Sequence, residues 1–205
     1  MKNKGVLYAL CAGISWGISL GIFGRTMTSF GFTAMQVSAV RTTISAITFI
    51  ILALVTDRKA FRLNPKDIWI FLCSGFISVT LFCWCYFTST RLCSLAVGGV
   101  LQYTAPVWVV VFSAVIFKEP ITKVKAAAMA IAIAGCVLVS GITHGVGQVS
   151  AFGLVAGVFS GITYGSYTIF TRFAVPKYRT MTINVYTFIV ASTTSLLLSG
   201  PVKTV

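Results

Sequence analysis

The chain alternates between long apolar runs and short polar segments. A helix needs roughly 20 apolar residues to cross a bilayer, and the apolar runs reach that length. The breaks include polar loops at 57–67 and 176–179, a tight turn at Ser89–Arg91, and the end of the fourth run at Lys118–Pro120. The pattern predicts an all-α fold, a polytopic transmembrane helix bundle. We expect about seven spans, at residues 5–24, 33–55, 67–88, 92–117, 122–142, 151–171 and 181–200.

The composition supports a membrane protein and excludes a nucleic-acid binder. Of the 205 residues, 57% are hydrophobic and 9% are charged, whereas soluble domains carry about a quarter charged residues. A net charge of +13 could by itself indicate a nucleic-acid partner. The basic residues, however, lie in short segments between apolar runs and form no single face. We therefore expect the lipid bilayer as a partner and no nucleic acid.

Lys and Arg are distributed unevenly over the two sides of the predicted bundle. If the N-terminus is cytoplasmic, twelve of the sixteen basic residues lie on the cytoplasmic side, three lie outside and Arg41 lies within a span. An excess of Lys and Arg marks the cytoplasmic loops of membrane proteins. The sequence therefore predicts a multi-pass protein with a cytoplasmic N-terminus.

One five-residue phrase occurs twice. Gly13–Gly17 reads G-I-S-W-G, and Gly161–Gly165, 148 residues later, reads G-I-T-Y-G. Small residues recur at every fourth position around each phrase, which gives a helix one smooth face that another helix can approach closely. Helix packing alone accounts for the glycines, but the matching aromatic residues indicate a duplicated unit.

The duplication has an inverted topology in this interpretation. Five predicted spans separate one copy from the next, and because five is odd, the second copy enters the membrane from the opposite side. Inverted repeats are common in secondary transporters. We predict a five-helix repeat at 1–144 and the first two helices of a second, inverted and incomplete repeat at 145–205.

Several features of the first copy occur together in a characteristic order. They are the Gly13–Gly17 helix, Arg41, the stretch from Tyr86 through Ser94–Ala96 to Tyr103–Pro106, the segment 117–122, and Gly135 and Gly141. In this combination the chain resembles the EamA group of the drug/metabolite transporter superfamily. The resemblance implies ten spans in two inverted halves and a location in a bacterial-type plasma membrane. This chain stops at Val205, after the seventh predicted span.

The fourth predicted span contains a proline next to polar residues. Pro106 has no N–H, so the carbonyl of Gln102 loses its helical partner and a kink is expected. Substrate sites of transporters lie at broken helices near the membrane midplane. Gln102, Tyr103 and Pro106 are therefore candidate substrate-binding residues. The alternative is a structural kink with local hydrogen bonding.

Arg41 is the one charged residue predicted inside a span. A charged side chain at the bilayer centre costs about 2.5–3.5 kcal/mol on the insertion scale. One interpretation is that Arg41 faces a cavity and attracts an anionic substrate group. The other is that it snorkels or binds backbone carbonyls.

Trp16 and Tyr164 occupy matching positions in the two phrases. They could form two walls of a substrate cavity, stacking on a ring or an apolar body, or they could only pack. Tyr86 and Asn184 are weaker candidates for the same pocket.

The residue types needed for catalysis or metal binding are missing from the spans. Their membrane-embedded parts contain no histidine and no carboxylate, and the six cysteines form no C-x-x-C pair. We therefore expect no metal and no cofactor. An intramembrane enzyme needs a nucleophile with a base or a metal, so catalysis is not expected either. Coupling to ions through a membrane carboxylate is likewise not expected within these residues.

The sequence as a whole indicates a secondary transporter that moves a small metabolite or amphipathic solute across the plasma membrane by alternating access. The alternative is a truncated, transport-inactive membrane protein, or a half-transporter that needs a homodimer or a complementary chain.

Overall fold

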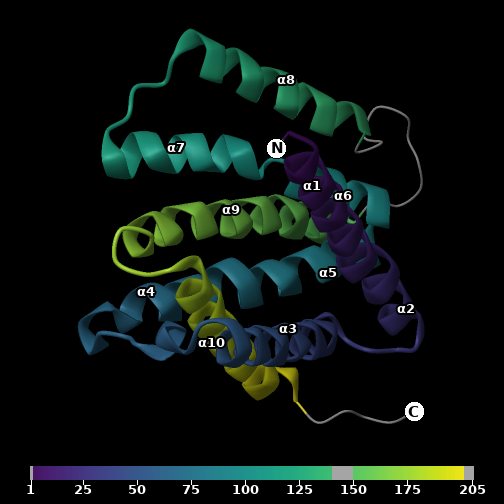
Figure 1. The fold of residues 1–205 in the computed structure, drawn as a ribbon. Helices are drawn as coiled ribbons and strands as arrows, with labels where there is room; N and C mark the ends of the chain where they lie inside the picture. Colours follow the sequence, from purple (N-terminus) through teal and green to yellow (C-terminus); the bar gives the residue numbers. More distant parts are fainter. Residues whose placement is uncertain (1, 140–149, 201–205) are drawn as a thin grey trace.

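The computed structural model describes residues 2–139 and 150–200, with side chains described except at 2–4, 7–9 and 12. The predicted repeat boundary at 144/145, Gly141 and residues 201–205 lie outside the described residues. Within the described part all regular structure is helical (Figure 1). This confirms the predicted all-α class.

The described helices form seven successive rods, some of them divided. The first contains two α-helices joined by a π-helical stretch, and the third also has a π-helical middle. In order, the elements are α1 (Lys2–Trp16), η1 (Gly17–Ile22) and α2 (Phe23–Ser29); α3 (Ala34–Thr56); the short η2 (Arg58–Phe61); η3 (Pro65–Asp67), α4 (Ile68–Cys73), η4 (Ser74–Leu81) and α5 (Phe82–Leu92); α6 (Leu95–Gln102) and α7 (Ala105–Phe117); α8 (Lys123–Val139); α9 (Ala151–Ala174); and α10 (Thr180–Ser199).

Each rod overlaps one predicted span. By length and apolar composition, four helical segments of the described chain could cross a membrane: Ala34–Thr56, Pro65–Leu92, Leu95–Phe117 and Thr180–Ser199. Many large apolar side chains on the rods are exposed, including Leu197 at 79% and Val115 at 72%. Such a surface suits a lipid environment.

The predicted tight turn at Ser89–Arg91 is wrong. Helix α5 continues to Leu92, and the chain turns at Cys93 and Ser94. Ser94 ends the turn because its hydroxyl accepts a hydrogen bond from the Val97 N–H (3.1 Å) and caps α6. The polar residues Ser89–Arg91 fit into the helix in part because the Thr90 hydroxyl donates a hydrogen bond to the Phe87 carbonyl of the same helix (3.1 Å).

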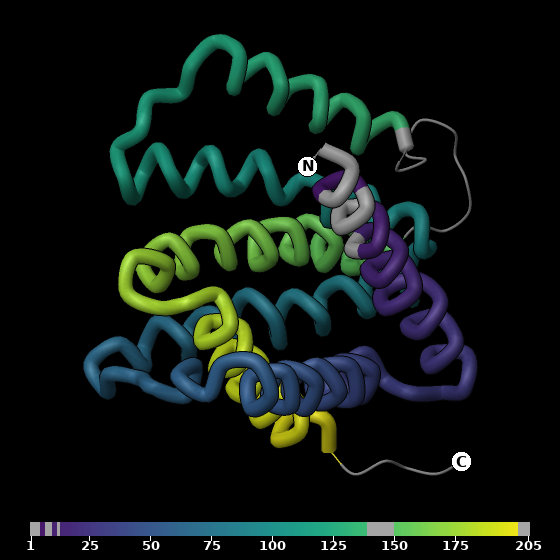
Figure 2. Tube along the Cα trace, in the orientation of Figure 1, coloured from purple at the N-terminus to yellow at the C-terminus, as the bar shows by residue number. Residues whose placement is uncertain are grey.

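The rods stack in the order α8, α7, α9, α5 and α3, and α10 packs on α3 (Figure 1). The tube in Figure 2 shows α8 along one edge of the bundle and α3 with α10 along the opposite edge. Helix α9 therefore lies in the middle, between α7 and α5. It also contacts α4, η4 and α6, so its main contacts with the first predicted repeat are to the third and fourth rods.

Side-chain hydroxyls join α10 to its neighbours. Thr43 and Ser192 lie 2.8 Å apart, and Ser74 and Thr187 lie 2.9 Å apart. Thr80 donates to the Ala191 carbonyl (3.1 Å). Hydrogen bonds of this kind hold membrane helices together where the hydrophobic effect does not distinguish helix from lipid.

The glycine faces of the two phrases are used differently. A methyl group at Gly161 would overlap the Thr104 hydroxyl, and one at Gly165 would lie 3.0 Å from the Ala105 carbonyl oxygen. These glycines let α9 approach the junction of α6 and α7 closely. At Gly13 and Gly17, by contrast, an added methyl group would meet nothing within 4 Å.

Candidate functional site

The aromatic residues of the two phrases are in contact. The Trp16 and Tyr164 rings have centroids 5.7 Å apart and planes inclined by 58°. Two hollows lie beside this ring pair, and both residues line both hollows. The Trp16–Tyr164 pair is therefore a wall common to both hollows.

The first hollow, here called the aromatic cavity, has a volume of about 240 Å³. Helices α1, α3, η4, α5, α9 and α10 contribute to it. Six of its nine lining residues are aromatic, and Arg41 is the one charged residue among them. The lining consists of Trp16, Arg41, Phe49, Ser78, Val79, Phe82, Tyr164, Tyr167 and Phe188. Such a cavity suits an apolar or aromatic body bearing one polar group.

Arg41 is held at the cavity by side chains. Its Nε donates to Ser19 Oγ (2.9 Å), and its Nη1 donates to Cys83 Sγ (3.2 Å). Within the described residues these are its two hydrogen bonds, which use two of the five guanidinium donors. No carboxylate of the described chain forms an ion pair with it. The guanidinium thus has donors and a positive charge available for a ligand.

Both π-helical stretches carry residues of the site. Ser19, which binds Arg41, lies in η1, and Ser78 and Val79 of the cavity lining lie in η4. π-helical segments occur often at functional sites because they rotate side chains out of the regular helical order. Ser78 also bonds Ser166 of α9 across 2.7 Å, which gives the cavity a polar edge.

The second hollow, here called the α1–α6 groove, has a volume of about 430 Å³. It lies along the break in the fourth rod. It is lined by Gly13, Trp16, Gly17, Gln102, Tyr103, Ala105, Pro106 and Tyr164. The predicted proline-linked break is present, since α6 ends at Gln102 and α7 begins at Ala105.

The polar groups at this break are partly satisfied by side chains. The Thr104 hydroxyl donates to the Leu101 carbonyl (2.7 Å) and accepts from Trp108 Nε1 (3.3 Å). Gln102 is buried and Tyr103 is 68% exposed. The break therefore presents an amide and a phenol to the groove.

Two predicted residues line neither hollow. Tyr86 is buried in the core and packs on Phe82 and Phe87, with ring centroids 6.0 and 5.3 Å away. Asn184 lies behind the wall of the aromatic cavity, where its Oδ1 accepts from the Tyr167 hydroxyl (3.2 Å). Asn184 can thus orient a lining residue.

Sequence reasoning missed six residues that line the aromatic cavity: Phe49, Ser78, Val79, Phe82, Tyr167 and Phe188. An aromatic residue within an apolar run has the same sequence pattern around it whether it faces lipid, the core or a cavity, so the sequence does not distinguish these positions. A signal existed only for Tyr167, which lies three residues after Tyr164 and hence on the same helix face.

The described residues contain no group of three or more histidine, cysteine, aspartate or glutamate side chains that could hold a metal ion. Comparisons with curated proteins and with solved structures give no match. The model of the EamA-like transporter family matches residues 3–141, more than half of the chain. The chain therefore belongs to the EamA-like transporter family, and its function is of the membrane-transporter type.

Proposed function

We propose that this chain is a secondary transporter that carries a small metabolite or amphipathic solute across the plasma membrane by alternating access. The single observation that carries this proposal is the aromatic cavity, which both phrases of the predicted repeat line through Trp16 and Tyr164. In an inverted repeat, related helices on either side of a central site exchange roles as the site turns from one membrane face to the other.

The proposed substrate follows from the cavity. A volume of about 240 Å³ corresponds to about eight water molecules at roughly 30 Å³ each, so one small solute fills it. The aromatic walls favour a flat or apolar body. Arg41 favours an anionic or hydrogen-bond-accepting group at one end.

The topology completes the proposal. The N-terminus is cytoplasmic, residues 1–144 form the first repeat, and 145–205 contribute the start of the second. The excess of basic residues at one end of the predicted spans supports this orientation.

The proposal is tested by uptake into proteoliposomes that contain the full chain. A panel of small aromatic and aliphatic acids is offered, and saturable uptake is compared with that of Trp16→Ala and of Trp69→Ala. Trp69 is the matched control because it lies outside both hollows and packs on Phe173. We expect loss with Trp16→Ala alone. Absence of saturable uptake for the whole panel, in a correctly inserted protein, would contradict transport by this chain alone.

A half-transporter is the second candidate, and the open glycine face of α1 favours it. Gly13 and Gly17 border the α1–α6 groove and have space beside them, whereas Gly161 and Gly165 are in close contact with the α6–α7 break. A second copy or a complementary chain could pack on that face. The molar mass of the purified protein in detergent, measured with Gly13→Leu as the comparison, tests for such an assembly.

A further inference from the structure

All three carboxylates of the chain make ion pairs with residues 172–179, at the end of α9 and in its connection to α10. Asp57 Oδ2 lies 2.8 Å from Arg179 Nη1, and Asp67 Oδ1 lies 2.6 Å from Lys177 Nζ. Glu119 Oε1 lies 2.7 Å from Arg172 Nη2. The three carboxylates come from two connections of the first predicted repeat: Asp57 and Asp67 lie between α3 and α4, and Glu119 lies between α7 and α8. One short segment of the second predicted repeat is thus tied to all three carboxylates.

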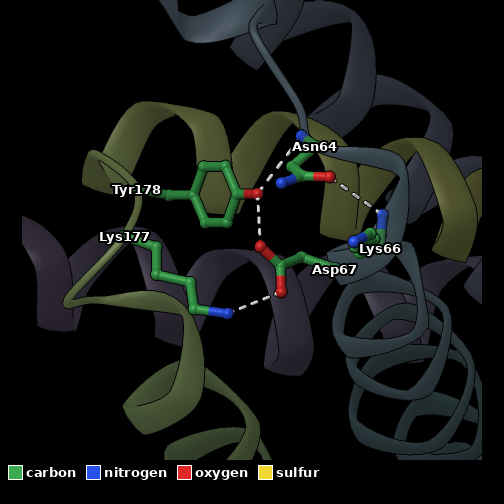
Figure 3. A network of polar contacts seen from close by, with 5 residues as sticks. All are labelled: Asn64, Lys66, Asp67, Lys177 and Tyr178. Atoms are coloured by element: carbon green, nitrogen blue, oxygen red, sulfur yellow. Dashed lines mark hydrogen bonds and ion pairs between the residues drawn. The ribbon is translucent and has the colours of Figure 1, made fainter.

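The side chain of Asp67 is the least exposed of the three carboxylates, and Figure 3 shows its contacts with Lys177 and Tyr178. Asp67 is 8% exposed and also accepts from the Tyr178 hydroxyl (2.8 Å). That hydroxyl in turn accepts from the Asn64 N–H (3.2 Å). The Tyr178 ring packs edge-on against Phe71, with centroids 5.5 Å apart. The α9–α10 connection is therefore fastened by charge, hydrogen bonds and packing at one point.

The Glu119 contact joins the end of α7 to the end of α9. The guanidinium carbon of Arg172 lies 4.0 Å from the centre of the Phe117 ring, and Phe117 packs on Phe173 at 5.4 Å. A weaker contact of Glu119, with Lys125, measures 3.9 Å.

Helix α9 connects these ion pairs to the aromatic cavity. Tyr167 of the lining and Arg172 lie on the same helix, five residues or about 7.5 Å apart along the axis. Because α9 is continuous through both, a shift of its 172–174 end displaces Tyr164 and Tyr167. The opposite end of the bundle has a hollow of about 410 Å³ with a mixed lining of Arg25, Thr28, Thr90, Ser94, Leu20, Leu95 and Ala96.

We propose that the three ion pairs form a latch that holds the bundle closed at the 57–67 and 172–179 end, and that the latch must break for the aromatic cavity to open on that side. The inference rests on the proposed alternating-access function, and it identifies the contacts that hold the bundle in one of its two conformations. Exposed ion pairs are individually weak, so three of them favour one state without making it permanent. A few such contacts suffice to shift a two-state equilibrium.

The test measures access to the cavity rather than transport. A cysteine reporter, Ser78→Cys, is placed in the full chain after the six native cysteines are replaced by serine. A charged, membrane-impermeant thiol reagent is then added to inside-out vesicles, from the predicted cytoplasmic side. With Asp57→Asn and Glu119→Gln combined, we expect labelling about tenfold faster than with the latch intact.

Charge reversal separates the latch from damage to the fold. Arg179→Asp should speed labelling, and adding Asp57→Arg should restore the slow rate because the pair is rebuilt with its charges exchanged. The matched control is Arg62→Gln with Lys66→Gln, in the same loop, since neither residue forms an ion pair within the described chain. The control should leave labelling unchanged.

The outcomes distinguish this inference from the proposed function. Faster labelling that the exchanged pair reverses supports the latch even if no solute is transported, in which case only the transport proposal fails. Unchanged labelling in the neutralised variants, or no rescue by the exchanged pair, overturns the latch even if the chain transports.

Discussion

The guanidinium carbon of Arg41 lies 5.6 Å from the centre of the Trp16 ring. A cation over an aromatic face gains about 0.5–1 kcal/mol at exposed sites and about 2 when desolvated. This contact and the bonds to Ser19 and Cys83 account for an arginine inside a span without a carboxylate partner. They also hold the charge at the edge of the aromatic cavity.

Replacing Arg41 with glutamine should weaken the binding of an anionic solute. A hydrogen bond to a charged group contributes about 1.5–3 kcal/mol, so we expect KM to rise about 10- to 100-fold. The KM of Arg41→Lys should lie between those of the unsubstituted protein and Arg41→Gln, because lysine keeps the charge but lacks the planar guanidinium. Concentration-dependent uptake measures both. If Arg41 is only structural, Arg41→Gln lowers the thermal stability and leaves KM unchanged.

Solute affinity should depend on the ring of Tyr164 and not on its hydroxyl group. Tyr164→Phe keeps the contacts with Trp16 and with Phe82, whose ring centroid lies 5.1 Å away. We expect solute affinity to stay within about threefold. Tyr164→Ala removes a ring worth about 0.5–1.5 kcal/mol per aromatic contact, and affinity should fall about tenfold. Equal effects of the two substitutions on binding would argue against a wall formed by the ring.

Matched glycines in the two phrases should respond to alanine with opposite signs. Gly161→Ala places a methyl group against the Thr104 hydroxyl, and overpacking costs about 1–3 kcal/mol. Gly13→Ala meets nothing within 4 Å, so higher helix propensity should stabilise it by up to about 1 kcal/mol. Thermal unfolding in one detergent compares them. A loss at Gly13 as large as that at Gly161 would mean that the α1 face is occupied in the purified protein.

The latch should be insensitive to pH near neutrality and fail in acid. The hydrogen bond from Arg179 lowers the pKa of Asp57 below its ordinary value of 3.8. That contribution is present above pH 3.8 and is lost as the pH falls through the lowered pKa. Because thiol reagents react with the thiolate, the labelling rate is divided at each pH by that of a fully exposed cysteine. This ratio should be flat between about pH 5 and 9 and rise only below about pH 4.

The Asp67–Lys177 ion pair should weaken at high pH. The hydrogen bond to Asp67 raises the pKa of Lys177 above its ordinary value of 10.5. Its contribution is present below pH 10.5 and is lost as the pH rises through the raised pKa. Asp57→Asn should abolish only the part of the acid response that belongs to Asp57. A transition near pH 6 or 7 would show that other groups control access.

The pairing of Trp16 with Tyr164 was accessible from sequence because the repeated phrase places them at equivalent positions. Their partner Phe82 was not, whereas Tyr86, one helical turn later, was a weaker candidate for the same pocket. The two residues share a helix face in regular geometry. Both are buried in the same core cluster, and the packing of α5 on α9 decides that Phe82 alone also lines the aromatic cavity.

By itself the sequence determined the helical class, the approximate positions of the seven rods and the family resemblance, because hydrophobicity, length and motif order are local properties of the chain. It also placed the proline break at Pro106 for the same reason. The tertiary structure alone decided which faces of the helices meet. Lys177 forms an ion pair with Asp67, 110 residues away in the chain. Arg41 donates a hydrogen bond to the Ser19 hydroxyl rather than to a backbone carbonyl. Such contacts depend on the rotation and crossing of packed helices, which only the assembled bundle defines.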